Sequence, residues 1–193
     1  RITNKSFNRW KFFPNFSKKI FNKITLALPQ NNETKKYLQL LGVKNIKIAG
    51  NLKYFGNFEK RNFQNNLKNK FYKRNVWCAA STHNKEEIFI GRVHSELKSE
   101  IKNLITIIIP RHINRRESII NEISRIGLKY QLHSENRKIK KNTDIYLVDT
   151  YGEAIKFYLL SKLTFLGGSV IKHGGQNPLE PAREGNYILH GPN

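Results

Sequence analysis

The chain has 193 residues, enough for one full domain and part of a second, and it carries 35 Lys and Arg against 14 Asp and Glu. The formal net charge of +21 predicts an anionic partner such as nucleic acid, an acidic membrane surface or a phosphorylated substrate, although a biased composition rich in Asn, Ile and Lys explains part of it. A single cysteine, Cys78, excludes an internal disulfide framework, and no run approaches the ~20 apolar residues that span a bilayer. Because the chain starts at Arg1 and contains no Met, we expect it to be a piece of a longer protein.

The first 23 residues combine basic and aromatic side chains and contain no acidic residue. Pro14 divides this stretch, which predicts two short helices. Lysines beside bulky rings are typical of a helix that lies on anionic lipid, with the rings at the level of the headgroups. Core packing explains the same rings equally well, so both interpretations stay open. The apolar members are Phe7, Trp10, Phe12, Phe13, Phe16, Ile20 and Phe21.

The next segment has the pattern of a strand, a helix and a second strand. The expected bounds are residues 24–28, 32–41 and 46–49, with Gly42 ending the helix. The sequence GNLKY follows at residues 50–54, and a polar segment rich in Asn and Lys runs to about residue 75. This segment is a plausible crossing between two domains, where Lys53 is either a functional cation or a solvated surface lysine.

From residue 75 onward, near-continuous apolar strands alternate with helices, which predicts an α/β fold with a doubly wound parallel sheet. The expected strands are residues 76–80, 104–109, 128–132, 145–148, 163–166 and 187–189, and the expected helices are residues 85–101, 115–126 and 151–161. Ligands of open parallel sheets bind at the carboxyl ends of the strands. There the sequence places Ser81, Arg111 and the Tyr151-Gly152-Glu153 turn.

These side chains have both functional and ordinary interpretations. Arg111 is suited to a phosphate or to stacking on a base, and Glu153 or Glu180 to hydrogen bonds from ribose hydroxyls. Taken singly, Arg111 is also explained as a surface cation and Glu153 as a first-turn carboxylate. Their joint placement at one edge favours a binding site.

The segment FLGGSVIKHGGQNPLEPA, residues 165–182, organises this edge. Its four glycines allow the backbone to approach a ligand, and Lys172 adds positive charge. Asn177 is expected to cap a helix that starts at Pro178, with Glu180 as the acidic half of a capping box. This pattern favours half of a nucleotide-sugar site, with a tight strand-to-helix turn as the alternative. No spacing of His, Cys or Asp typical of a metal site occurs, so neither a metal nor another cofactor is expected.

With GNLKY, AASTH, IIIPRH and DTYGE in that order before GGSVIKHGGQNPLEPA, the chain resembles the 3-deoxy-D-manno-octulosonic acid (Kdo) transferases over essentially its whole length. The resemblance implies a GT-B glycosyltransferase that moves Kdo from CMP-Kdo to the lipid A precursor, lipid IVA, during lipopolysaccharide synthesis. It also implies a place at the cytoplasmic face of the bacterial inner membrane, in contact with anionic lipid. Residues 1–50 would end an N-terminal acceptor-side domain, and residues 51–193 would form a Rossmann-like CMP-Kdo domain that is incomplete at its end.

The resemblance also assigns site residues. It implies CMP contacts from Pro110, Arg111, Tyr151, Gly152, Glu153, Asn177, Pro178, Leu179 and Glu180, and transition-state stabilisation by Lys53. The edge of the sheet adds Ser81, Gly168 and Lys172 as possible donor contacts. Tyr151 departs from the methionine usual at its position. The family's general-base glutamate and last helices have no counterpart in these residues, so we expect the chain to be inactive by itself.

Two other classes of protein remain. One is another GT-B nucleotide-sugar enzyme, such as a different sugar transferase or an epimerase. The other is a basic nucleic-acid-binding module, which explains the charge but gives the strand-end residues no role and shows no RNA- or DNA-reading motif. We therefore expect no nucleic-acid partner.

Overall fold

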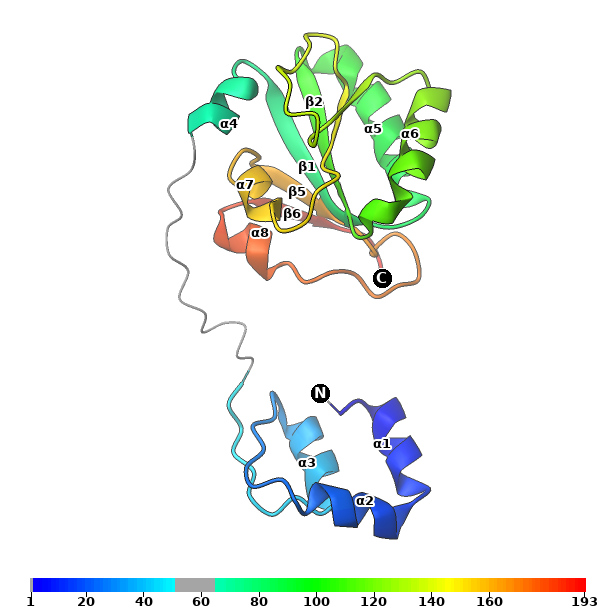
Figure 1. The fold of residues 1–193 in the computed structure, drawn as a ribbon, viewed down its shortest axis with the longest axis vertical. Coiled ribbons are helices and arrows are strands. Elements are labelled where there is room, and N and C mark those ends of the chain that lie inside the picture. Colours follow the sequence, from blue (N-terminus) through cyan, green and yellow to red (C-terminus); the bar gives the residue numbers. More distant parts are fainter. Residues whose placement is uncertain (1, 51–64) are drawn as a thin grey trace. The chain divides into compact units, whose positions relative to one another are not determined.

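The computed structural model describes residues 2–50 and 65–193 (Figure 1). The chain divides into two compact units, residues 1–61 and 62–193, each with its own hydrophobic core. Within the described ranges, no helix is long and apolar enough to cross a membrane. Lys53 lies outside the described residues.

The N-terminal unit consists of three short helices: α1 (Asn4–Lys11), α2 (Pro14–Phe21) and α3 (Asn32–Leu40). The break between α1 and α2 lies before Pro14, as predicted, because proline suits the first helical position, where its missing N–H costs nothing. α3 follows the cap Asn31, whose side chain accepts a hydrogen bond from the Thr34 N–H at 2.9 Å. The helix also ends as expected, beside Gly42 with φ +103°.

The phenylalanines of α1, α2 and the turn between them divide into two groups. Phe7 and Phe21 are buried, whereas Phe12, Phe13 and Phe16 are 79%, 66% and 59% exposed. Beside the core lies a pocket whose walls are mostly apolar and include the side chains of two lysines, Lys11 and Lys18. Core packing therefore accounts for Phe7 and Phe21 and leaves the other three rings at the surface.

The two strands predicted for the N-terminal unit are wrong. Only a single parallel bridge forms, between Ala27 and Ile46, although the Ala27 N–H donates to the Asn45 carbonyl at 3.0 Å and the Lys47 N–H to the Ala27 carbonyl at 3.0 Å. Alternate apolar residues of these segments, Leu26 and Ile48, are each 46% exposed. A lone pair of segments with one uncovered face lacks the partners that make a strand pair stable.

The C-terminal unit is built around a six-stranded sheet in the order β3-β4-β2-β1-β5-β6, and every pairing is parallel. This confirms the predicted doubly wound α/β fold. The strands are β1 (Asn75–Thr82), β2 (Leu104–Pro110), β3 (Tyr130–Leu132), β4 (Ile145–Leu147), β5 (Leu163–Leu166) and β6 (Tyr187–His190). The helices are α4 (Asn65–Lys70), α5 (Glu86–Glu100), α6 (Arg116–Arg125), α7 (Ala154–Tyr158) and α8 (Leu179–Arg183), and a 3-10 turn, η2 (Ile113–Arg115), precedes α6.

Helices cover both faces of this sheet (Figure 1). α5 and α6 pack on one face, where Ile90, Ile119 and Ile123 join a core with alternate residues of β1, β2 and β4. On the other face, Phe157 of α7 and Phe71 pack against Tyr146 and the remaining strand residues. The central strands are buried on both sides, which is why they are largely apolar.

The helix predicted over residues 151–161 is much shorter in the structure. α7 starts only at Ala154 because Gly152 has φ +79°, a conformation outside the helical region. At its other end, the Tyr158 carbonyl accepts a hydrogen bond from the Asn186 side-chain amide at 2.8 Å instead of continuing the helix.

Candidate functional site

The carboxyl ends of β1, β2 and β5 are joined by backbone hydrogen bonds into one rim. The Arg111 N–H donates to the Thr82 carbonyl at 3.0 Å, and the Gly167 N–H donates to the Ala80 carbonyl at 2.8 Å. Between Ala80 and Thr82 the register of β1 shifts, and Ser81 has φ +55°. The predicted residues Ser81 and Arg111 therefore lie on neighbouring strand ends, with Pro110 buried and Arg111 exposed.

The first glycine of the loop is required by packing. A Cβ on Gly167 would lie 2.2 Å from the Ser81 carbonyl oxygen and 2.6 Å from the Thr82 Cα. Both atoms belong to the backbone of β1, so no side chain can rotate away. The glycines were expected to let the backbone approach a ligand. At Gly167 the backbone instead approaches the neighbouring strand, β1.

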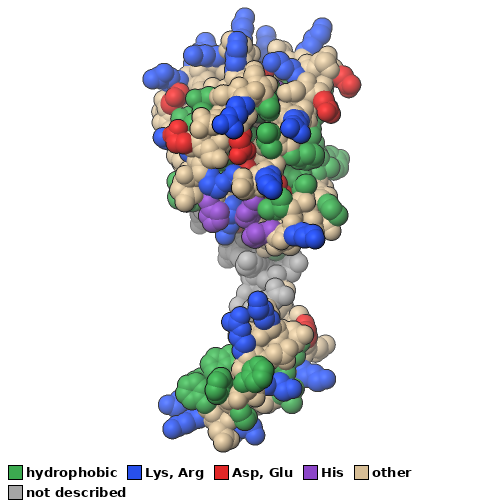
Figure 2. All heavy atoms as spheres, turned by 90° about the vertical axis from the view of Figure 1, so that its right-hand side faces the viewer, with side chains coloured by type: hydrophobic (Ala, Val, Ile, Leu, Met, Phe, Trp, Pro, Cys, Tyr) green, Lys and Arg blue, Asp and Glu red, His purple; other side chains and the backbone are tan. Residues whose placement is uncertain are grey.

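Three histidines converge above this rim. The rings of His83 and His173 are 4.2 Å apart between centroids, and those of His83 and His112 are 6.1 Å apart. The Gln176 side chain is hydrogen-bonded to His83 Nε2 at 3.2 Å. Burial lowers the pKa of His83, and the nearby His173 lowers it further. Figure 2 shows histidine side chains gathered at the surface of the C-terminal unit, with Lys and Arg side chains around them.

Gly168 lies close to two of these histidine rings. Its φ is +71°, and a Cβ there would lie 3.3 Å from His173 Nδ1 and 3.4 Å from His83 Cδ2. The predicted donor contact Gly168 therefore lies within the histidine cluster, while Lys172 is exposed nearby in the loop. No sequence pattern indicates this cluster, because His83 and His173 are far apart in the chain.

Two consecutive carboxylates at the start of α5, Glu86 and Glu87, are fully buried, and sequence reasoning missed both. Glu86 accepts hydrogen bonds from backbone N–H groups of the glycine loop. Glu87 forms a bidentate ion pair with Arg115, at 2.8 Å and 3.1 Å, and accepts a hydrogen bond from Thr82 Oγ1 at 3.0 Å. The sequence does contain a signal for them, the pair of acidic residues directly after STHNK. A position in the first turn of a helix explains such a pair equally well.

Glu153 lies in a dense polar network. Its Oε2 accepts hydrogen bonds from Thr150 Oγ1 at 2.5 Å and from His133 Nε2 at 2.9 Å, and its Oε1 pairs with Lys156. Burial alone would raise the pKa of Glu153, but the hydrogen bonds from Lys156 and Thr150 lower it to about 2. Each carboxylate oxygen accepts about two hydrogen bonds, so one acceptor position on Oε1 remains for a ligand hydroxyl.

The predicted capping of the last loop helix is wrong in detail. α8 starts at Leu179, its cap is Pro178, and no side chain caps it. Asn177 Oδ1 instead accepts the Leu179 N–H at 3.1 Å, two residues on, as in an Asx turn. Glu180 is exposed in the first turn of α8, so the predicted CMP-binding residues 177–180 form a surface turn that leads into the helix rather than a capping box.

An open parallel sheet with a glycine loop, clustered imidazoles and an arginine at its carboxyl edge defines a ligand-binding domain of the Rossmann-like class. Among the described residues, no group of three or more His, Cys, Asp or Glu is arranged to hold a metal ion. The independence from metal expected from the sequence stays a prediction.

Comparisons with known proteins show which proteins this chain resembles. A family model described as 3-deoxy-D-manno-octulosonic-acid transferase (kdotransferase) matches residues 1–55. The 3-deoxy-D-manno-octulosonic acid transferase of Haemophilus influenzae is 31% identical and covers 94% of this chain and 44% of its own length. That of Rickettsia prowazekii is 33% identical and covers 100% of this chain and 42% of its own length.

A solved structure extends the match to the fold. The C-terminal CMP-Kdo binding domain of WaaA from Acinetobacter baumannii has a TM-score of 0.58 and 31% identity, and the match covers 61% of this chain and 62% of that one. The resemblance to the Kdo transferases is thus confirmed, and this chain is a relative of those enzymes. It spans less than half the length of the two curated relatives.

Proposed function

We propose that the whole protein is a glycosyltransferase of the GT-B type that transfers Kdo from CMP-Kdo to the lipid A precursor in lipopolysaccharide synthesis. The observation that carries the proposal is the similarity to Kdo transferases along this chain, which includes the loops at the carboxyl edge of the sheet. The solved relative is a CMP-Kdo binding domain, which supports CMP-Kdo as the donor.

In this proposal the carboxyl edge of the C-terminal unit holds the donor. CMP is bound by Pro110, Arg111, Tyr151, Gly152, Glu153, Asn177, Pro178, Leu179 and Glu180, and the donor sugar is contacted by Ser81, Gly168 and Lys172. Glycosyl transfer develops negative charge on the departing phosphate, which cations and N–H donors stabilise. Arg111 meets this need at the rim and Lys53 is assigned to it by the resemblance, so no metal is required. The base that deprotonates the acceptor belongs to the remainder of the whole protein.

Nucleotide selectivity tests this function against another GT-B enzyme. We expect the complete protein to bind CMP at least tenfold more tightly than UDP or ADP, a difference of about 1.4 kcal/mol, because the proposed donor carries cytidine monophosphate. Titration calorimetry with the three nucleotides measures it. Arg111→Ala should weaken CMP binding, whereas Arg92→Ala on the exposed side of α5 serves as the matched control.

Equal or tighter binding of UDP or ADP would favour a different nucleotide-sugar enzyme. Tight binding of RNA or DNA with no nucleotide selectivity would favour the nucleic-acid module. Neither result is expected, because the similarity is to Kdo transferases and the charge alone motivates the nucleic-acid module.

We also propose that the N-terminal unit contacts the cytoplasmic face of the bacterial inner membrane, where the lipid acceptor lies. The exposed rings Phe12, Phe13 and Phe16 support this proposal, since apolar rings flanked by Lys11 and Lys18 suit the headgroup region of anionic lipid. Hydrophobic and basic side chains lie side by side on the surface of this unit (Figure 2).

Vesicle binding tests the membrane proposal. We expect retention on vesicles that contain anionic lipid, weakening as salt is raised, because exposed charges are screened beyond about 8 Å at physiological ionic strength. Replacing Phe12, Phe13 and Phe16 together by serine should abolish most of the retention. The control Leu28→Ser changes another half-exposed side chain of the same unit, 49% exposed, and should have little effect. Equal retention on neutral and anionic vesicles would contradict the proposal.

A further inference from the structure

The carboxylate of Glu86 is saturated by backbone amides from two segments that meet at the rim. Its Oε2 accepts the His83 N–H at 2.9 Å and the Gly168 N–H at 2.7 Å. Its Oε1 accepts the Ser169 N–H and the Val170 N–H, each at 3.2 Å. The residue is 0% exposed. The four backbone N–H groups therefore take the place that water has around an exposed carboxylate.

This arrangement changes what the glycine loop does. Three consecutive N–H groups after a strand are the kind of cradle that binds a phosphate. In this chain Glu86 already occupies the cradle, so the amides of Gly168, Ser169 and Val170 are not available to a substrate anion. The groups left facing outward at this point are the imidazoles of His83 and His173.

The same carboxylate ties His83 to the glycine loop. The His83 backbone is held by Glu86, and its ring lies 4.2 Å from that of His173, which the loop carries. Gln176, from the same loop, is hydrogen-bonded to His83 Nε2. Glu86 therefore fixes the distance between the β1–α5 segment and the loop without reaching the surface itself.

We propose that Glu86 is a positioning residue of the donor site, which sets His83 and the glycine loop in the relative arrangement that binds the nucleotide-sugar. This inference rests on the proposed function. Glu86 acts only through the groups it holds and does not touch the substrate.

Glu86→Gln tests the proposal because it alters the hydrogen bonding and leaves the shape almost unchanged. A carboxamide has one acceptor oxygen, and its NH₂ group would face two N–H donors. Glu87→Gln is the matched control: it removes an equally buried carboxylate one residue away whose partners are Arg115 and Thr82. Both variants are measured in the complete protein, below their unfolding temperatures.

We expect Glu86→Gln to weaken CMP binding about tenfold or more and to raise KM for the donor, with turnover at saturating donor and KM for the acceptor less affected. Hydrogen exchange at residues 168–170 should speed up in this variant. Glu87→Gln should retain CMP affinity within about twofold, even if it loses as much thermal stability as Glu86→Gln does. A merely structural role for Glu86 would give the two variants the same CMP affinity, and that result overturns the proposal.

If Glu86→Gln does not fold, Glu86→Asp decides, because it keeps the charge and withdraws the carboxylate by one methylene. Weaker CMP binding in a folded Asp variant supports the positioning role, and unchanged binding overturns it. A wild-type protein without preference for CMP would instead refute the proposed function. Hydrogen exchange at residues 168–170 still reports whether Glu86 holds the loop in that case.

Discussion

Replacing Gly167 by alanine is expected to destabilise the C-terminal unit by about 3 kcal/mol, at the upper end of the cost of forcing extra atoms into a packed core. The added Cβ would lie 2.2 Å from the Ser81 carbonyl oxygen and 2.6 Å from the Thr82 Cα. Relief requires β5 and β1 to separate where the Gly167 N–H donates to the Ala80 carbonyl at 2.8 Å. Chemical denaturation of the wild type and the variant measures the difference.

The control for this substitution is Gly174→Ala in the same loop. Gly174 has φ +97° and no atom within 4 Å of the added Cβ, so only conformational strain applies, about 1–2 kcal/mol. A similar loss of stability in the two variants would show that the contact with β1 does not decide the effect. Gly167→Ala should also weaken CMP binding in whatever fraction folds, because Ser81 lies at the rim.

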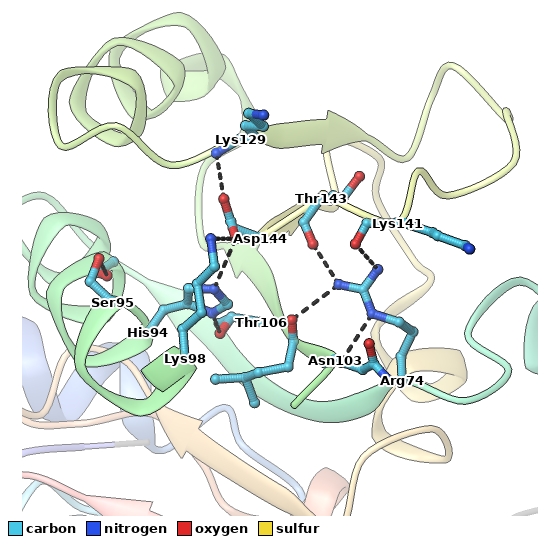
Figure 3. A network of polar contacts seen from close by, with 12 residues as sticks. Arg74, His94, Ser95, Lys98, Asn103, Thr106, Lys129, Lys141, Thr143 and Asp144 are labelled. Carbon is cyan, nitrogen blue, oxygen red and sulfur yellow. Dashed lines mark hydrogen bonds and ion pairs between the residues drawn. The ribbon is translucent and has the colours of Figure 1, made fainter. Parts of the chain in front are cut away.

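Replacing Arg74 by methionine is expected to cost about 3 kcal/mol of unfolding free energy, since it keeps the aliphatic stem and removes a set of charged hydrogen bonds, two of them partly buried. Its guanidinium donates to five backbone carbonyls. Figure 3 shows those of Asn103, Lys141 and Thr143 around it. The two less exposed bonds, to Leu104 at 3.0 Å and to Thr143 at 2.5 Å, should account for most of the loss, because water replaces the others more easily.

Arg74 also offers a test of separate roles for the two ends of the sheet. Its partners Leu104 and Thr143 lie at the amino ends of β2 and β4, where Lys98 and Asp144 pair at 2.6 Å, whereas the candidate site lies at the carboxyl ends. Folded Arg74→Met should therefore bind CMP as the wild type does. Arg74→Lys should recover part of the stability, and Arg92→Met, on exposed helix surface, should change it little. Unaltered stability in Arg74→Met would contradict the assigned role.

Strong apolar periodicity made the central elements predictable. The bounds predicted for β5, residues 163–166, are those observed, and β1, β2 and α5 differ from prediction by one or two residues. Predictions failed where a long-range partner decides the local structure. The segments at residues 24–28 and 46–49 read as strands but form a single bridge, and α7 ends early where the Tyr158 carbonyl accepts a hydrogen bond from the Asn186 side chain.

By itself the sequence determined the alternation of buried strands and helices, hence the parallel sheet, and it determined the motifs that relate the chain to the Kdo transferases. Only the tertiary structure showed which residues the rim brings together. Glu86 reads locally as a first-turn helix carboxylate, yet its partner Gly168 is 82 residues further along the chain. The two meet because the sheet order places β1 beside β5. The physical reason is that local patterns record which face of an element is apolar, whereas the partner of a buried polar group depends on which strands become neighbours.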